Sequence, residues 1–126
     1  MFTHAFLGSN DIERSRKFYD ATMAELGYEN AVPPEAGLLV YRGPAGTLIV
    51  SKPLDGEPAS VANGATLGLG AADDETVTRW HEAGLASGGT CEGPPGPRER
   101  AQGSVGAYLR DPDGNKLCGL YRIPKE

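Results

Sequence analysis

The 126-residue sequence has two cysteines, no cluster of basic residues and no long apolar run. Cys91 and Cys118 form neither a Cys-x-x-Cys metal motif nor a disulfide framework. The formal net charge of −5 argues against nucleic acid as the main partner, and the missing apolar run argues against a membrane span. The first residues lack the charged and apolar regions of a signal peptide, so we expect a cytoplasmic protein with reduced thiols.

Glycine and proline, by contrast, are abundant, with 18 and 10 residues. They are spread over many turns rather than concentrated in one block, which favours a turn-rich folded chain over disorder. The length suits one domain, residues 1–126, with a hydrophobic core of its own.

The clearest local signal is residues 105–121, which predict a β-hairpin. Val105, Ala107 and Leu109 occupy alternate positions, the period of a half-buried strand. The turn sequence DPDGN follows at 111–115, where Pro fixes φ and Gly allows a positive φ. A second strand is expected over 116–121.

A similar hairpin occurs earlier in the chain. The motif Arg-x-Pro-x-Gly-x-x-(Ile/Leu) begins at Arg42 and again at Arg110. The number of residues between His4 and Thr66 in the sequence equals the number between the aromatic residues Phe18 and Trp80. These matches predict two copies of one unit of about 60 residues.

Each copy is predicted to be βαβββ. In the first, we expect strands over 2–7, 28–32, 38–42 and 47–52, with a helix that starts after Asn10 as N-cap and ends near residue 26. In the second, we expect a strand over 65–71, a helix over 74–87 capped by Asp73, and a short strand over 90–92 before the hairpin. The prolines within 93–104 predict an irregular loop. Module one is then 1–53, the linker 54–63 and module two 64–126.

This order of elements, with FYD at 18–20 and RDPDGNKL at 110–117, resembles the vicinal oxygen chelate superfamily of glyoxalases, extradiol dioxygenases, and fosfomycin and bleomycin resistance proteins. The resemblance covers essentially the whole chain. It implies an α+β fold in which two tandem βαβββ modules form one open, cup-shaped sheet. It also implies a site on the concave face, away from the helices, and a homodimer. One such fold hosts many functions.

Strand pairing predicts which side chains reach that face. The second turn pairs Tyr108 with Cys118, and the first is expected to pair Val40 with Val50. The expected concave face consists of Phe2, His4, Phe6, Val40, Leu48, Val50, Lys52, Thr66, Gly68, Tyr108, Cys118 and Leu120.

The resemblance implies metal ligands, His or Glu, on the first and last strands of each copy. The matching positions are His4, Val50, Thr66 and Cys118. Val50 cannot ligate, and one His with a Cys and a hydroxyl is a poor set for a divalent ion that polarises an oxygen substrate. We therefore expect no metal, and a divalent metal with His4 as one ligand is the alternative.

Several other side chains are candidates for ligand contact or chemistry. The hydroxyl of Tyr108 could form a hydrogen bond with a ligand, or its ring could simply pack in the core. His4 could contact a ligand or form a hydrogen bond with a neighbouring residue. Cys118 could be a nucleophile with His4 as base, or a small buried hydrophobe. Arg98, and Lys52 in the same way, could bind a carboxylate or phosphate. The expected ligand-binding set is Phe6, Val50, Lys52, Thr66, Arg98, Cys118 and Leu120.

Three functions fit these residues. The first is metal-free binding of a small, largely apolar or aromatic molecule in the cup. The second is a glyoxalase-like lyase or dioxygenase that uses a divalent metal, which the ligand set disfavours. The third is a metal-free isomerase or lyase with His4 and Tyr108 as acid and base. The residues do not choose between the first and the third, so whether the protein is an enzyme stays open.

Overall fold

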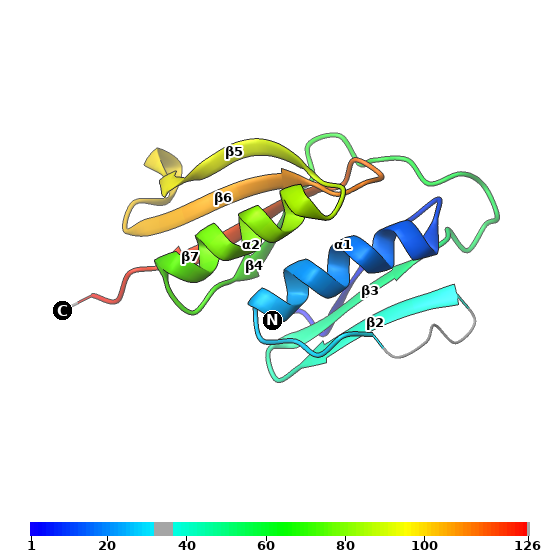
Figure 1. Ribbon diagram of the computed structural model, residues 1–126, viewed down its shortest axis with the longest axis horizontal. Helices are drawn as coiled ribbons and strands as arrows, with labels where there is room; N and C mark the ends of the chain where they lie inside the picture. The colour runs from blue at the N-terminus through cyan, green and yellow to red at the C-terminus, as the bar shows by residue number, and fades with distance from the viewer. Residues whose placement is uncertain (32–36, 126) are drawn as a thin grey trace.

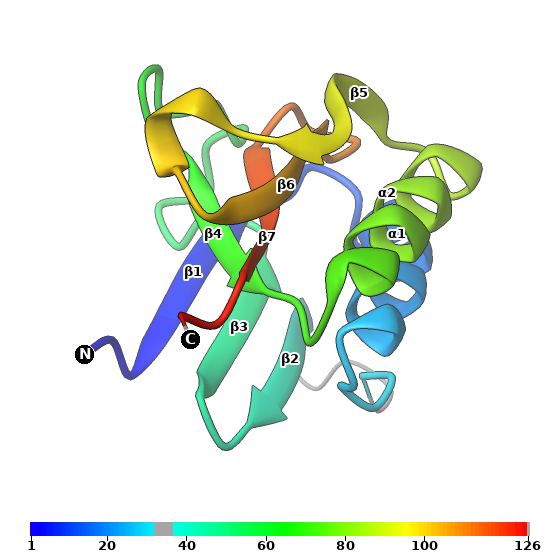
Figure 2. The ribbon, with the colours of Figure 1, turned by 90° about the vertical axis from the view of Figure 1, so that its left-hand side faces the viewer.

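The computed structural model describes residues 1–31 and 37–125. Two helices lie side by side and cover one face of two mixed sheets (Figures 1 and 2). The elements in order are β1 (His4–Gly8), α1 (Ile12–Glu25), β2 (Leu38–Gly43), β3 (Gly46–Ser51), β4 (Leu67–Gly70), α2 (Asp74–Ala86), β5 (Thr90–Pro97), the 3-10 turn η2 (Glu99–Ala101), β6 (Ser104–Arg110) and β7 (Lys116–Arg122). The predicted α+β class, with an open sheet, is confirmed.

The two halves share one strand topology. The first sheet has the order β1-β3-β2 and the second the order β4-β7-β6-β5. In each sheet the first strand of the half pairs parallel with its last strand, as β1 does with β3 and β4 with β7. The strand expected over 28–32 is not found, because residues 28–31 are irregular. Residue 32 lies outside the described residues. Among the described residues the first half is therefore βαββ.

Both helices begin at an aspartate whose side chain accepts a hydrogen bond from a backbone N–H of the first turn. Asp73 caps α2 as expected, but α1 is capped by Asp11 rather than by Asn10. The side chain of Asn10 instead exchanges two hydrogen bonds with the backbone of Ala59, at 2.7 and 3.2 Å. Asn10 therefore ties the segment between the two halves to the start of α1.

The core fills the space between the helices and the sheets. Its fully buried members from the helices are Phe18, Tyr19, Val77 and Trp80, and they pack with Leu39, Tyr41, Leu48, Val50, Ala107, Leu109 and Leu117 from the strands. A Cβ on Gly119 would lie 2.6 Å from Cε3 of Trp80, so only glycine lets the indole lie this close to β7. The helices cover one face of the sheets, and we call the opposite side the open face (Figure 2).

The predicted register of the second hairpin is confirmed, since Tyr108 pairs with Cys118. The register of the first hairpin is wrong by one residue, because Val40 pairs with Ile49 rather than with Val50. A shift of one residue exchanges the faces of a strand. Leu48 and Val50 therefore lie in the core beneath the helices, at 3% and 0% exposure, and Ile49 faces the open side.

The segment 93–104 is not the irregular loop that its prolines predict, because β5 continues to Pro97. This strand lies at the edge of its sheet, where proline is tolerated. Its register shifts between Cys91 and Gly93 and again between Gly93 and Gly96. These irregularities let an extended chain with three prolines run along β6. Within the described residues, no helix is long and apolar enough to cross a membrane.

Candidate functional site

The open face carries both apolar and polar side chains. In the first sheet, strand alternation places His4, Phe6, Val40, Arg42, Thr47 and Ile49 on this side. In the second sheet, the same argument places Thr66, Gly68, Gly70, Gly106, Tyr108, Cys118 and Leu120 there. Of the expected concave set, Leu48, Val50 and Lys52 do not belong to this face.

β1 and β4 are the strands of the two sheets that lie nearest the seam between them, and residues of both line a hollow of about 460 Å³ there. We call it the seam hollow. Its lining comes from both sheets and from the helix side, to which Met23 of α1, Tyr28 and the core residue Leu48 belong. The full lining is Phe2, Thr3, His4, Ala5, Met23, Tyr28, Ala45, Gly46, Thr47, Leu48, Thr66, Leu67, Gly68, Leu69 and Gly70. A Cβ added at Gly68 or Gly70 would meet no atom within 4 Å, so no side chain fills the hollow next to these two residues of β4.

The seam hollow brings together two of the predicted site residues, His4 and Thr66. Nδ1 of the exposed His4 lies 2.9 Å from the hydroxyl oxygen of Thr3. This contact leaves Nε2 as the imidazole atom that can meet a ligand. Thr66 precedes β4 and is exposed.

Tyr108 and Cys118 form the middle of the open face in the second sheet. The neighbouring Cys118, and then burial, raise the pKa of Tyr108, while burial chiefly raises the pKa of Cys118. Both groups therefore stay protonated at neutral pH. A buried thiol with a raised pKa is a poor nucleophile, which argues against the nucleophilic role considered for Cys118.

Two cations lie close to the Tyr108 ring. Cζ of Arg98 is 5.2 Å from the ring centroid, and Nζ of Lys116 is 5.3 Å from it. Arg98 is held by the carbonyl oxygen of Gly106, which accepts from Nε at 3.0 Å and from Nη2 at 2.7 Å. The backbone of β5, extended where a loop was expected, is what delivers Arg98 to this face.

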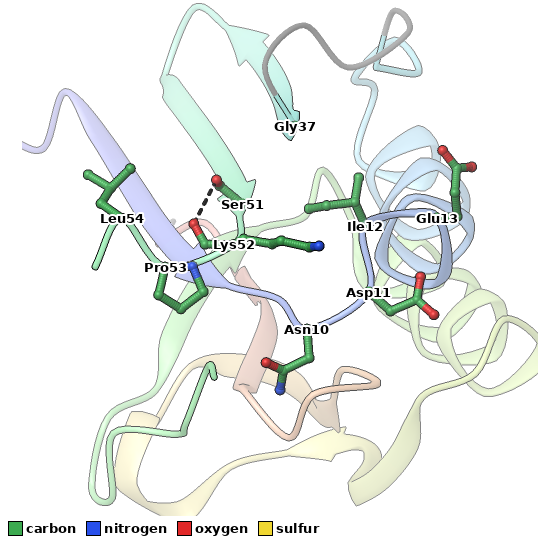
Figure 3. A pocket seen from close by; sticks show the side chains of 9 residues that line it. All are labelled: Asn10, Asp11, Ile12, Glu13, Gly37, Ser51, Lys52, Pro53 and Leu54. Atoms are coloured by element: carbon green, nitrogen blue, oxygen red, sulfur yellow. Dashed lines mark hydrogen bonds between the residues drawn. The ribbon is translucent and has the colours of Figure 1, made fainter. Parts of the chain in front are cut away.

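Two predicted ligand-binding residues lie elsewhere. Val50 is fully buried in the core. Lys52 lines a separate hollow of about 680 Å³, beside Asp11 and Glu13 at the start of α1 (Figure 3). The expectation that these two side chains face the cup is wrong, because the first hairpin pairs one residue out of the expected register.

Sequence reasoning missed Ile49 and Lys116 on the open face. Gly43 pairs with Gly46, so only two residues separate the first pair of strands. Reading that connection as a two-residue turn would have placed Ile49 correctly. Lys116 lies within the predicted hairpin two residues from Cys118, on the same face.

His81 and Cys91 form a contact away from the open face. Nε2 of the buried His81 lies 3.2 Å from Sγ of the exposed Cys91. Burial lowers the pKa of His81, so the imidazole is neutral at neutral pH. This contact joins α2 to β5 and gives His81 a structural role.

The residues on the open face do not fit a divalent metal. Of the four positions that the resemblance equates with metal ligands, His4, Thr66 and Cys118 lie on the open face, and the corrected register places Ile49 there instead of Val50. Ile49 has no donor atom, and the raised pKa of Cys118 opposes formation of a thiolate ligand. In residues 1–31 and 37–125, no three His, Cys, Asp or Glu side chains are grouped so that they could hold a metal ion.

The fold is thus an open α+β structure of two related halves, with a hollow where they meet. The sequence model of the Glyoxalase/Bleomycin resistance protein/Dioxygenase superfamily matches residues 2–118. The chain belongs to this superfamily, as the resemblance implied.

Solved structures agree with this assignment. A glyoxalase/bleomycin resistance protein from Albidiferax ferrireducens T118 is 48% identical, with a TM-score of 0.90 over 97% of this chain and 98% of that chain. A glyoxalase-related enzyme from Fulvimarina pelagi is 20% identical, with a TM-score of 0.76 over 97% and 88%. Lactoylglutathione lyase from Agrobacterium tumefaciens is also 20% identical, with a TM-score of 0.66 over 96% and 92%. The search of curated proteins found no match.

Proposed function

We propose that this protein binds a small, largely apolar or aromatic molecule on its open face, without the metal that metal-dependent relatives use. The observation that carries the proposal is the seam hollow, about 460 Å³ in volume, where His4 and Thr66 join a mainly apolar lining. A concave, mostly apolar surface with a few polar groups is typical of a small-molecule site.

The donor set supports binding without a metal. His4 is the one imidazole on the described open face, and Ile49 and Thr66 replace the stronger ligands of metal-dependent relatives. Elemental analysis of protein purified without chelator should give much less than one equivalent of Ni, Zn, Mn or Fe per chain. About one equivalent, lost in His4→Ala, would contradict this part of the proposal.

The alternative is acid–base catalysis by His4 and Tyr108. Its support is that both side chains face the open side and that the raised pKa keeps Tyr108 a proton donor. However, β4 and β7 lie between β1 and β6, so one small substrate would have to reach across these strands. The likeness to lactoylglutathione lyase shows a shared fold at 20% identity and does not carry its activity to this chain.

Ligand binding can be tested by blocking the seam hollow. Gly68→Leu places a side chain where a Cβ meets no atom within 4 Å, so it should fill the hollow without disturbing the core. We expect phenol and small aromatic compounds to raise the melting temperature of the wild type and to have little effect on this variant. Ala86→Leu, on the exposed end of α2, is the matched control and should respond like the wild type. A Gly68→Leu protein that binds as well as the wild type would refute the proposed location.

A further inference from the structure

Two positive charges share one aromatic ring on a protein whose net charge is −5. Arg98 and Lys116 approach Tyr108 to 5.2 and 5.3 Å from its centroid. Each cation is attracted to the face of the ring by a cation–π interaction. The two cations repel each other, and this repulsion is stronger at a partly buried surface than in water. An anion at the edge of the ring, within reach of both cations, would relieve that repulsion.

Neither cation forms an ion pair with a described residue, although the carboxylate of Glu92 lies close enough to Lys116 for that cation to help lower its pKa. The ion pairs found among the described residues use Arg14, Arg16, Arg79 and Arg110. Arg110, which pairs with Lys116 across the hairpin, shows the contrast, because its guanidinium is bound to the carboxylate of Glu92.

Arg98 is oriented by backbone groups. Its guanidinium donates to the carbonyl oxygens of Gly106 and Pro94. Carbonyl oxygens fix the direction of a guanidinium but leave its net charge in place, and the remaining N–H groups can bind an oxyanion. A preorganised cation of this kind loses little entropy when it binds an anion.

A third cation adds to the positive field. Arg100, in η2, lies close enough to Tyr108 to oppose the rise in the pKa of its hydroxyl, and Arg98 acts in the same direction. The ring of Tyr108 is therefore the centre of a cationic cluster, which we define as Arg98, Arg100 and Lys116.

An apolar path leads from this cluster to the seam hollow. Across the sheet from Tyr108 lie Cys118 and then Gly68, on the neighbouring strands β7 and β4. Neighbouring strands are about 4.8 Å apart, so Tyr108 and Gly68 are separated by about 10 Å. Gly68 carries no side chain, and Cys118 is an uncharged thiol, so a flat apolar group can lie over them.

From this arrangement, and resting on the proposed function, we infer that the ligand is a small organic acid. Its carboxylate binds Arg98 and Lys116 at the edge of the Tyr108 ring, and its apolar body lies over Cys118 and Gly68 with its far end in the seam hollow. The separation of about 10 Å between the ends of the path suits one aromatic ring joined to a carboxylate by a short chain.

The test compares an acid with its neutral analogue. We expect 3-phenylpropionate to bind at least about tenfold more tightly than 3-phenylpropionamide, measured by calorimetry at fixed low salt. Arg98→Met and Lys116→Met should each remove most of this preference, by weakening binding of the acid much more than binding of the amide. Arg79→Met also removes one positive charge, but from a half-exposed position on α2, and it should keep the wild-type preference.

The possible outcomes separate the two proposals. If acid and amide bind equally well, the assignment to an organic acid is wrong while the proposed function stands. If neither compound binds, the proposed function itself fails. Inorganic phosphate, added alone, should bind more weakly than 3-phenylpropionate, and equal affinity would overturn the role given to the apolar body. An equal loss of preference in Arg79→Met would show that net charge, rather than the cationic cluster, is responsible.

Discussion

The hydroxyl of Tyr19, in the middle of α1, donates a hydrogen bond to the carboxylate of Asp111, at the start of the turn between β6 and β7. Both residues are buried, at 0% and 4% exposure. Asp111 also accepts hydrogen bonds from the backbone N–H groups of Asp113 and Asn115. The same carboxylate thus shapes the turn of one half and binds the helix of the other.

Asp113 extends this connection. Its carboxylate accepts hydrogen bonds from the backbone N–H of Asn10 and from the side chains of Arg14 and Ser15. The amide of Asn115 donates to the carbonyl oxygen of Gly8 at 3.0 Å. The turn DPDGN therefore docks onto the end of β1 and the first turn of α1.

The first prediction concerns Tyr19. Burial, followed by the Asp111 carboxylate, raises the pKa of Tyr19, so its hydroxyl is a permanent donor. Tyr19→Phe should lower the free energy of unfolding by about 2 kcal/mol, the usual scale for a hydrogen bond to a charged group. Urea denaturation measures this. Tyr121→Phe, whose hydroxyl makes no hydrogen bond to a described residue, should cost much less, and equal losses would contradict the role of the bond to Asp111.

The second prediction compares two glycines on paired strands. A Cβ at Gly119 would lie 2.6 Å from the Trp80 indole, whereas one at Gly68 would meet nothing within 4 Å. Gly119→Ala should therefore cost about 1–3 kcal/mol through overpacking. Gly68→Ala should be neutral within about 0.5 kcal/mol. Thermal unfolding of both variants checks this, and a neutral Gly119→Ala would refute the close packing of Trp80.

The third prediction is a dependence on pH. The hydroxyl and the backbone N–H of Thr76 donate to Asp73 and lower the pKa of this N-cap carboxyl. A carboxyl with a lowered pKa in the folded state stabilises the fold above its unfolded pKa of about 4. That contribution is lost as the pH falls through the folded pKa.

Asp73→Ala should therefore melt at a lower temperature than the wild type at neutral pH, and the difference should shrink in acid. Melting curves over a pH series provide the measurement. Asp55→Ala makes the same charge change outside the helices and should show little effect at any pH. A difference for Asp73→Ala that stays constant down to strong acid would exclude this linkage.

The fourth prediction distinguishes the two thiols. Cys91 is exposed and Cys118 is buried, and burial raises the pKa of the Cys118 thiol. A thiol reagent such as a disulfide dye should react with one cysteine quickly and with the other slowly. The fast phase should disappear in Cys91→Ser and persist in Cys118→Ser. Survival of the fast phase in Cys91→Ser would reverse the assignment.

The fifth prediction is the homodimer. Phe2 and Phe6, beside the seam hollow and on the open face of β1, are 80% and 43% exposed. Apolar side chains exposed together favour contact with a partner surface. Sedimentation should give twice the mass of one chain, and Phe6→Glu should shift the protein toward the monomer. A wild-type protein that sediments as a monomer would end this expectation.

The two hairpins show how far sequence reasoning reaches. The turn DPDGN was sufficient to predict the register of the second hairpin. In the first hairpin, Leu48, Ile49 and Val50 are consecutive apolar residues, so β3 is apolar on both faces. Alternation carries no information about register in such a strand, and the tighter turn, where Gly43 pairs with Gly46, decided it instead.

The cationic cluster could not be predicted from the sequence, for a different reason. Arg98 was a candidate from the sequence, but its position over Tyr108 depends on an extended β5. The prolines at 94, 95 and 97 predicted a loop, because their cost in a sheet depends on whether the strand lies at an edge. Edge position is a property of the whole sheet, and local sequence does not encode it.

Along β7, Leu117 and Gly119 face the helices while Cys118 and Leu120 face the open side. Neighbouring residues of one strand therefore have different surroundings, one set packing in the core and the other forming the open face. Changes at Cys118, Leu120 or Gly68 alter the open face without disturbing the contact between Trp80 and Gly119. Substitutions on the open side of β7 should therefore change that surface at little cost to the stability of the fold.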